Sequence, residues 1–381
     1  MTQLSKLSIL GIGKETVPGT YVVPTAYLPF TKADFEDVYQ EIKDESYRAN
    51  DTTLQGMYQG PVDSTFDIDL WAYPDLVGWF LRGIIGPDTV TAGIATTLSS
   101  STIVGATSIT TVASIPLGST IQIDTGNNIE YATTGTPSGA GPYTIPIATP
   151  ATGLTKIHSS AVAVVTPTVH TFKQSTAQPA SYSLTVYDTT QTLGFAGAKI
   201  SDLGIKIDPK SAVSFSTKFK TFPSIVQSPI TPAFTAFAPA LGWEWTMVNA
   251  GSSSTRGLTY DLAIKRAVDP IHSSDGVQAP REIFAGTLDA DGTYKAIFEN
   301  QTDLNLYLQY IQQPATATLT QPLSAGGASL ALTTSKSGWF KGKRDLSPTY
   351  LQANFSLSGI YNTTDSGAVS AVLSNYQTSA Y

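Results

Sequence analysis

The same strand–turn–helix pattern occurs twice in this chain, and this repetition constrains the fold more than any other feature. In residues 66–70 apolar and acidic residues alternate, and a turn at Tyr73 leads into the apolar run 76–81. In residues 294–298 apolar positions alternate again, and a polar turn leads into the run 304–308. A period of two predicts a strand with one buried face, and each apolar run after an acid predicts a short amphipathic helix.

The spacing between matching residues indicates a duplicated domain with an insertion in its first copy. Asp75 and Asp303, which open the two helical runs, lie 228 residues apart. Phe195 and Phe340, which open two similar five-residue segments further along, lie only 145 residues apart. The drop of 83 residues is close to the length of a low-charge segment that only the first half contains. One interrupted duplication explains both spacings; the alternative is that similar strand patterns arose twice.

The low-charge segment, residues 90–166, predicts a small all-β module. Its charged residues are Asp124, Glu130 and Lys156. Short alternating runs such as residues 119–124 lie between turn signals rich in Gly and Pro, which is typical of short strands. A mucin-like linker is the alternative, but the regular alternation of isoleucines with polar neighbours favours a folded module.

These patterns predict a mainly β (α+β) fold with two tandem β-sandwich or open-barrel domains, each with a flanking helix, plus the inserted module. The first domain is predicted to be discontinuous, with residues 1–89 and 167–224; the module spans 90–166, and the second domain spans 225–381. The side chains expected to pack the helices onto their sheets are Trp79, Phe80, Tyr307 and Leu308. Open sheets leave unpaired edges, so such domains are expected to need neighbours.

The composition excludes several classes of function. The chain has no cysteine and only three histidines, which excludes disulfide scaffolds and thiolate metal sites. The formal net charge of −7 argues against DNA binding through a basic surface. The sequence contains no nucleophile elbow, no metalloprotease motif and no complete phosphate loop. We therefore expect no catalytic, metal-binding or cofactor-binding residues, no cofactor and no enzymatic activity.

The densest charged run is acidic and lies in residues 34–45. The apolar residues between these acids lie at helical spacing, which predicts a charged helix or a surface loop. A surface patch of one sign can repel a polyanion or meet a basic patch on a partner. In the strand of residues 66–70, the acids point away from the core. The candidate contact residues are Asp34, Glu36, Asp37, Glu41, Asp44, Glu45, Asp67 and Asp69.

Two stretches near the N-terminus resemble a known family. The first is Gly11-Ile-Gly-Lys-Glu-Thr16, followed by Pro18-Gly-Thr20 and Pro24-Thr25. The second is Tyr58-Gln-Gly-Pro-Val-Asp63, which continues through Phe66–Leu70 into Tyr73-Pro-Asp-Leu-Val-Gly78. Both are similar to the major tail tube proteins of long-tailed, non-contractile bacteriophages (siphophages). The likeness covers the part of the chain before the insertion; the rest resembles the family in composition and layout.

The resemblance implies a structural virion protein whose rings stack into the tail tube and form the conduit for DNA ejection. Its partners would be further copies of itself and the tape-measure, tail terminator and tail-tip proteins. Phage DNA would pass through without specific binding, and no membrane would be involved. The protein would reside in the tail of the virion after assembly in the host cytoplasm. A chain with two tube domains favours a trimeric ring with pseudo-sixfold symmetry; a hexameric ring is the alternative.

The resemblance also suggests roles for the acidic residues. The run from Asp34 to Glu45 is the candidate for contacts between stacked rings, and Asp67 and Asp69 face either the lumen or the solvent. The inserted module would decorate the outside of the tube. The alternative function is a polysaccharide-binding β-sandwich, like an adhesin or lectin, for which the 18 Tyr and 5 Trp residues would provide stacking surfaces.

Overall fold

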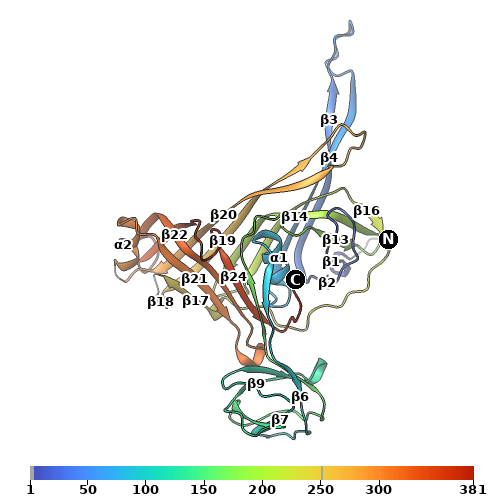
Figure 1. The fold of residues 1–381 in the computed structure, drawn as a ribbon. Coiled ribbons are helices and arrows are strands. Elements are labelled where there is room, and N and C mark those ends of the chain that lie inside the picture. Colours follow the sequence, from blue (N-terminus) through green and yellow to red (C-terminus); the bar gives the residue numbers. More distant parts are fainter. Residues whose placement is uncertain (1–3, 250–251, 300) are drawn as a thin grey trace.

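The computed structural model describes residues 4–249, 252–299 and 301–381, and most of them lie in antiparallel strands (Figure 1). The prediction of a mainly β fold is confirmed. Pairing links eighteen strands into one network, and the other six strands form a separate sheet. Within the described residues, no helix is both long and apolar enough to span a lipid bilayer.

The elements fall into three groups along the chain. The first half contains η1 (Ser5–Leu7), β1 (Ile9–Lys14), β2 (Ala26–Tyr27), β3 (Phe30–Asp44), β4 (Gly56–Trp71), α1 (Val77–Ile84), β5 (Asp88–Thr91), β12 (Thr168–Phe172), β13 (Tyr182–Tyr187), β14 (Thr192–Ile207), β15 (Ser214–Thr221) and β16 (Ile225–Gln227). The separate sheet and its turn contain β6 (Ala95–Thr97), β7 (Ser108–Thr111), β8 (Thr120–Ile123), η2 (Gly126–Asn128), β9 (Glu130–Thr134), β10 (Tyr143–Thr149) and β11 (Ala163–Val165). The second half contains η3 (Gly242–Glu244), β17 (Trp245–Asn249), β18 (Ser252–Ser254), β19 (Gly257–Ile271), β20 (Glu282–Ile297), α2 (Thr302–Leu308), β21 (Gln313–Thr320), η4 (Leu323–Ala325), β22 (Ser329–Asp345), β23 (Gln352–Gly359) and β24 (Ser370–Asn375).

The two halves use the same order of strand pairing. The first half pairs in the order β1-β13-β14-β15-β4-β3, and the second in the order β17-β21-β22-β23-β20-β19. In each half the helix follows the second strand of a long hairpin, which is β3–β4 or β19–β20. This shared order supports the proposal of a duplicated domain.

Interruptions in the ladders recur at matching places and align the halves residue by residue. The shift between Ile200 and Asp202 in β14 matches the shift between Trp339 and Lys341 in β22. The shift in β3 after Tyr39 likewise matches the shift in β19 after Arg266. Because a bulge is a specific feature of a strand, these matches fix the register that alternation alone leaves open.

This register corrects the alignment expected from the sequence. Matching the bulges aligns β4 with β20 so that Asp67 corresponds to Thr293, and Asp69 to Lys295. The spacing of 228 residues between Asp75 and Asp303 would instead match Asp67 with Lys295, which is two residues further along β20. A shift of two leaves the same side chains on the buried face, so hydrophobic alternation cannot detect the error.

One apolar cluster lies on the inner faces of both halves. Its largest members include Phe66, which stacks on Phe35 at 5.4 Å between ring centroids and meets Phe195 edge-on at 5.1 Å. Tyr294 and Phe355 form a similar stacked pair in the second half, 6.2 Å apart. All five side chains belong to this cluster or pack against it, so the two halves share one core.

The helix residues expected to pack against the sheets behave differently from one another. Phe80 is fully buried, and Trp79 is half-buried with its ring edge-on to Tyr182. Tyr307 is also half-buried against the core, but Leu308 is 58% exposed. The prediction for Leu308 is wrong for the single chain, in which this last residue of α2 is exposed. Asp75 precedes α1, and the side chain of Asp303 lies outside the described residues.

The acidic run forms a strand, not the helix or surface loop expected from its spacing. All of it except Glu45 lies in β3, whose hairpin with β4 projects from the body of the molecule, at the top of Figure 1. The helical spacing was misleading because the apolar residues of the projecting part, such as Val38 and Tyr39, are exposed. Their positions therefore do not mark a buried helix face.

The separate sheet is inserted in the chain between β5 and β12, which are neighbouring strands of the first half. Its own core includes Ile109, Ile121, Ile145 and Val164. The chain leaves the first half through β5 and returns through β12, and these two strands pair antiparallel. The two connections are therefore adjacent, as the lower part of Figure 1 shows. These observations support the proposal that residues 90–166 form an inserted module.

We predict that the Phe80→Ala variant loses about 3–5 kcal/mol of unfolding free energy, because truncating a buried phenylalanine leaves a cavity. Leu308→Ala is the control and should change the unfolding free energy by less than about 0.5 kcal/mol, because Leu308 is exposed. Urea unfolding of the unassembled chain measures both values. Equal losses for the two variants would contradict the assignment of Phe80 to the core.

We also predict that residues 93–166 can be replaced by a short Gly-containing turn without unfolding the rest of the chain. The pairing of Thr91 with Val169 brings the two ends of the module together, so a tight turn can join them. Circular dichroism and the urea midpoint of the shortened protein check this outcome. Loss of cooperative unfolding would show that the module is part of the host fold.

Candidate functional site

The two halves are joined edge to edge into one larger sheet. In the antiparallel pairing of β14 with β19, residues 202–207 lie opposite residues 260–265. The resulting strand order is β3-β4-β15-β14-β19-β20-β23-β22, and we call this the merged sheet. One of its faces covers the shared core, and the other face is polar. The polar face and the two end strands are the candidate functional surfaces.

Arg266 of β19 reinforces the joint between the halves. Its side chain is 9% exposed and reaches the C-terminal end of α1, where Nε and Nη2 donate to the carbonyl oxygen of Ile84 at 3.1 and 3.0 Å. Nη1 donates to the carbonyl oxygen of Gly286 at 2.9 Å. A cation at a helix C-terminus satisfies free carbonyl groups and complements the helix dipole. Burial lowers the pKa of Arg266, but a guanidinium stays charged in proteins.

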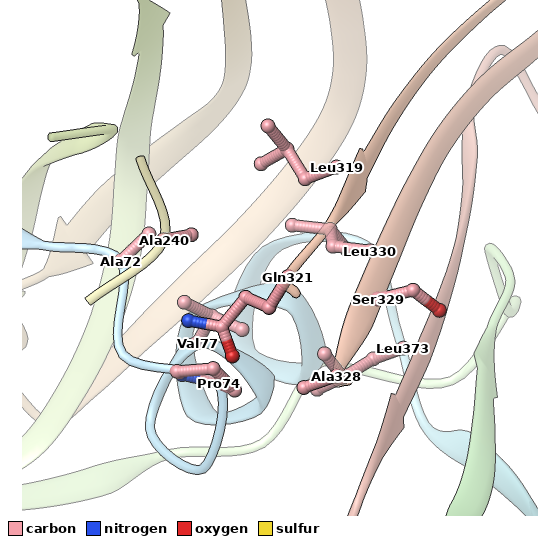
Figure 2. Close-up of a pocket in the computed structure, with 10 residues that line it drawn as sticks. All are labelled: Ala72, Pro74, Val77, Ala240, Leu319, Gln321, Ala328, Ser329, Leu330 and Leu373. Carbon is pink, nitrogen blue, oxygen red and sulfur yellow. The ribbon is translucent and has the colours of Figure 1, made fainter. Parts of the chain in front are cut away.

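A small cavity lies at the same boundary between the halves (Figure 2). Its volume is about 20 Å³, and it lies between Val77 of α1 and the end of the β21–β22 hairpin. The lining is almost entirely aliphatic, with Leu319, Leu330 and Leu373 on the side of the second half. A space of this size holds about one water molecule, so it is a packing feature of the joint and not a binding site for a substrate.

A row of charged side chains crosses the polar face. These residues lie directly opposite one another on successive strands: Asp34, Asp67, Lys218, Asp202, Lys265 and Asp289. From Asp67 to Asp289 the charges alternate in sign, and opposite charges on neighbouring strands stabilise a sheet by about 0.2–1 kcal/mol per pair. The like pair, Asp34 with Asp67, lies at the edge formed by β3. At that edge the row therefore ends in two acids, and the nearest cation on the same face of β3 is Lys32, opposite Asp69.

Asp67 and Asp69 both lie on this polar face, but they do not make it uniformly acidic. Asp67 lies opposite Lys218, and Asp69 lies opposite Lys32 and Ser216. Burial raises the pKa of Asp67, while the charge of Lys218 lowers it and the charge of Asp34 raises it. The face is thus a mixture of both signs.

The acids of β3 are distributed over different surroundings. Asp34 and Glu36 lie on the polar face, whereas Asp37 points to the other face and accepts hydrogen bonds from Ser64 Oγ and Ser224 Oγ, both at 2.6 Å. Glu41 is exposed further along the projecting hairpin. Asp44 binds Arg48 and the Ser46 amide, and hydrogen bonds from Ser46 lower its pKa. Glu45 follows, exposed, in the tip of the hairpin.

The sequence analysis missed the basic end of β22. Lys341, Lys343 and Arg344 lie on the last residues of this strand, at the opposite edge of the merged sheet from β3. The signal was present in the run Phe-Lys-Gly-Lys-Arg from Phe340, which we used only to detect the repeat. A cluster of three cations near the end of a predicted strand could have marked the edge.

The geometry is that of a large sheet with one polar face and incompletely paired edge strands. A family model described as phage tail tube protein matches residues 5–370. The chain therefore belongs to the phage tail tube protein family, whose members are structural components of the virion tail and assemble into a tube. No curated protein matches the chain.

We predict that the Arg266→Ala variant loses about 3 kcal/mol of unfolding free energy, because buried carbonyl groups at the end of α1 lose their donors. Lys265→Ala removes a neighbouring exposed charge from the same strand and should cost less than about 1 kcal/mol. Urea unfolding of the two variants gives the comparison. A loss for Arg266→Ala no larger than that for Lys265→Ala would contradict this role.

Proposed function

We propose that three copies of this chain close into a ring and that the rings stack into the tail tube of a long-tailed, non-contractile phage. The repeated pairing order carries this proposal, because each half contributes the same four-strand unit to the merged sheet. Three chains would place six similar units around one axis. That arrangement matches the hexameric ring which the family resemblance implies for single-domain subunits.

In such a ring the polar face of the merged sheet would line the lumen. The opposite face carries the core and both helices, so only the polar face is free to border a channel. Its charges alternate in sign from strand to strand, so the electric fields of neighbouring charges largely cancel one another. Salt screens what remains of the field beyond about 8 Å at physiological ionic strength. DNA could therefore move along the lumen without a specific binding site.

The remaining surfaces suggest roles in the assembled tail. Asp34, Glu36, Asp67 and Asp69 would face the lumen, and Glu41, Asp44 and Glu45 on the projecting hairpin would contact the next ring. Asp37 is already bound to two serines and would support the hairpin. The inserted module would lie outside the tube. Tape-measure, tail terminator and tail-tip proteins would be the partners along the lumen and at the two ends.

Electron microscopy of the concentrated, purified protein tests this proposal. We expect end-on averages with threefold symmetry and six similar lobes, because each chain contributes two units. Native mass spectrometry of the smallest closed species should give three chains. Rings of six chains would contradict the trimeric closure and support the hexameric alternative. A protein that stays monomeric at every accessible concentration, even with preformed tail tips as a nucleus, would contradict assembly of the tube from this chain.

A further inference from the structure

Both ends of the merged sheet carry a strand with an incompletely paired edge. β3 pairs with β4 along one side, and in the described residues no strand pairs with its other side. In β22, residues 338–345 pair only with β23 among the described strands, whereas residues 329–333 have β21 on one side and β24 on the other. An exposed edge presents free backbone donors and acceptors and favours the addition of another strand.

The joint inside the chain shows which strand fits such an edge. β14 and β22 hold the same place in the two pairing orders, and so do β19 and β3. Inside the chain, β19 adds to the edge of β14. The corresponding joint for the two edges of the merged sheet is therefore β3 added to the edge of β22, and these strands come from different chains.

We infer that β3 of one chain pairs antiparallel with residues 338–345 of β22 in a second copy of this chain. This inference deepens the proposed ring, on which it rests. Transferring the register of the internal joint through the matching bulges places Lys343 opposite Glu36, because Gly204 lies opposite Ala263. The same transfer places Lys341 opposite Val38, diagonal to Glu36.

Charge makes this joint directional. The internal joint contains two pairs of opposite sign, Asp202 with Lys265 and Lys206 with Asp261. At the outer edges the signs are separated: Asp34 and Glu36 lie on β3, and Lys341 and Lys343 lie on β22. Pairing β3 with β3, or β22 with β22, would therefore bring like charges together, which disfavours both wrong joints.

One contact in this register is between like charges and must be weighed. Asp345 falls opposite Asp34, but Lys343 lies diagonal to Asp34 and Lys32 lies diagonal to Asp345. Asp345 also accepts hydrogen bonds from Ser347 N at 3.0 Å and from Ser347 Oγ. Glu36 also lies diagonal to Asp345, so this end of the joint is unfavourable in charge, and the attraction comes from Lys343 opposite Glu36 and from Lys341 diagonal to it.

Exposed apolar side chains support the same joint. Arg266 of β19, which β14 covers, is 9% exposed, whereas Tyr39 at the matching place in β3 is 43% exposed. Tyr39 holds the place in β3 that Arg266 holds in β19, where it covers the end of α1. The corresponding end of α2 exposes Leu308. The added strand would therefore bring Tyr39 to the end of the neighbour's α2 and cover both apolar groups.

Charge reversal in the full-length chain tests the joint. The first variant, Lys341→Glu with Lys343→Glu, has two acidic edges; the second, Asp34→Lys with Glu36→Lys, has two basic edges. We expect both to stay folded monomers with unchanged urea midpoints, and we expect the protein concentration needed for ring formation to rise at least about tenfold, because like charges meet at every joint. The chain with all four substitutions should assemble within about twofold of wild type.

The matched control for the first variant is Lys173→Glu with Lys210→Glu, which gives the same net charge by changing two exposed lysines that belong to neither edge strand. It should assemble like wild type. If the edge variants assemble no worse than this control, the inferred joint is wrong even when tubes form. If the chain with all four substitutions fails to recover assembly, the opposite-charge contact is wrong.

An equimolar mixture of the two edge variants separates this inference from the ring size. Joints between unlike variants are matched in charge, and joints between identical variants are mismatched. A ring of three must contain at least one mismatched joint, so the mixture should still need a higher protein concentration than wild type to form three-chain rings. Efficient closure into rings of six chains would contradict the trimeric ring but support the joint.

A disulfide test does not depend on ring closure. The chain has no cysteine, so Glu36→Cys combined with Lys343→Cys introduces the only thiols. Residues directly opposite in antiparallel strands lie within the Cα separation that a disulfide spans. Oxidation should give covalent species of several chains, and Glu36→Cys combined with Lys210→Cys should give none. Absence of cross-links in protein that still assembles would overturn the joint.

Discussion

The antiparallel pairing of β14 with β19 is the interaction on which the rest of this structure depends. It converts two similar half-sheets into one continuous sheet and places their apolar faces over one core. Arg266 strengthens the joint because its buried guanidinium satisfies carbonyl groups at the end of α1 that would otherwise lack donors. The helix of the first half is therefore completed by a strand of the second, so each half depends on the other.

The inserted module affects this arrangement little because it enters and leaves through paired strands. Asp88 at the start of β5 binds Arg82 of α1 and lies 2.9 Å from His170 Nδ1 of β12. Burial works to raise the pKa of Asp88, but the hydrogen bond from His170 and the charge of Arg82 outweigh it, and the pKa is lowered. This charged network fixes the base of the module. Beyond it, Tyr131 packs against Tyr376 near η4 and orients the module on the second half.

Reasoning from the sequence identified strand patterns well and surface geometry poorly. Alternation around Phe66 predicted a strand with one buried face, which β4 shows, and the mainly β fold is confirmed. The run from Asp34 to Glu45 was mistaken for a helix or loop because three of its apolar residues, Val38, Tyr39 and Ile42, are exposed in the single chain and do not mark a buried face. The basic end of β22 passed unnoticed because the run from Phe340 was interpreted only as part of the repeat. The exposure of residues on an edge strand depends on which strand pairs with that edge, and the periodicity within one segment carries no information about this pairing.

The sequence by itself determined the class of fold and the repetition, because both depend on local alternation and on spacing along the chain. Only the tertiary structure decided the register between the halves, since a shift of two residues preserves every buried position and only the bulges distinguish the alternatives. Tertiary structure also decided that the acidic and basic strands lie at opposite edges of one sheet. Strand order depends on pairing between distant segments, and no local pattern encodes it.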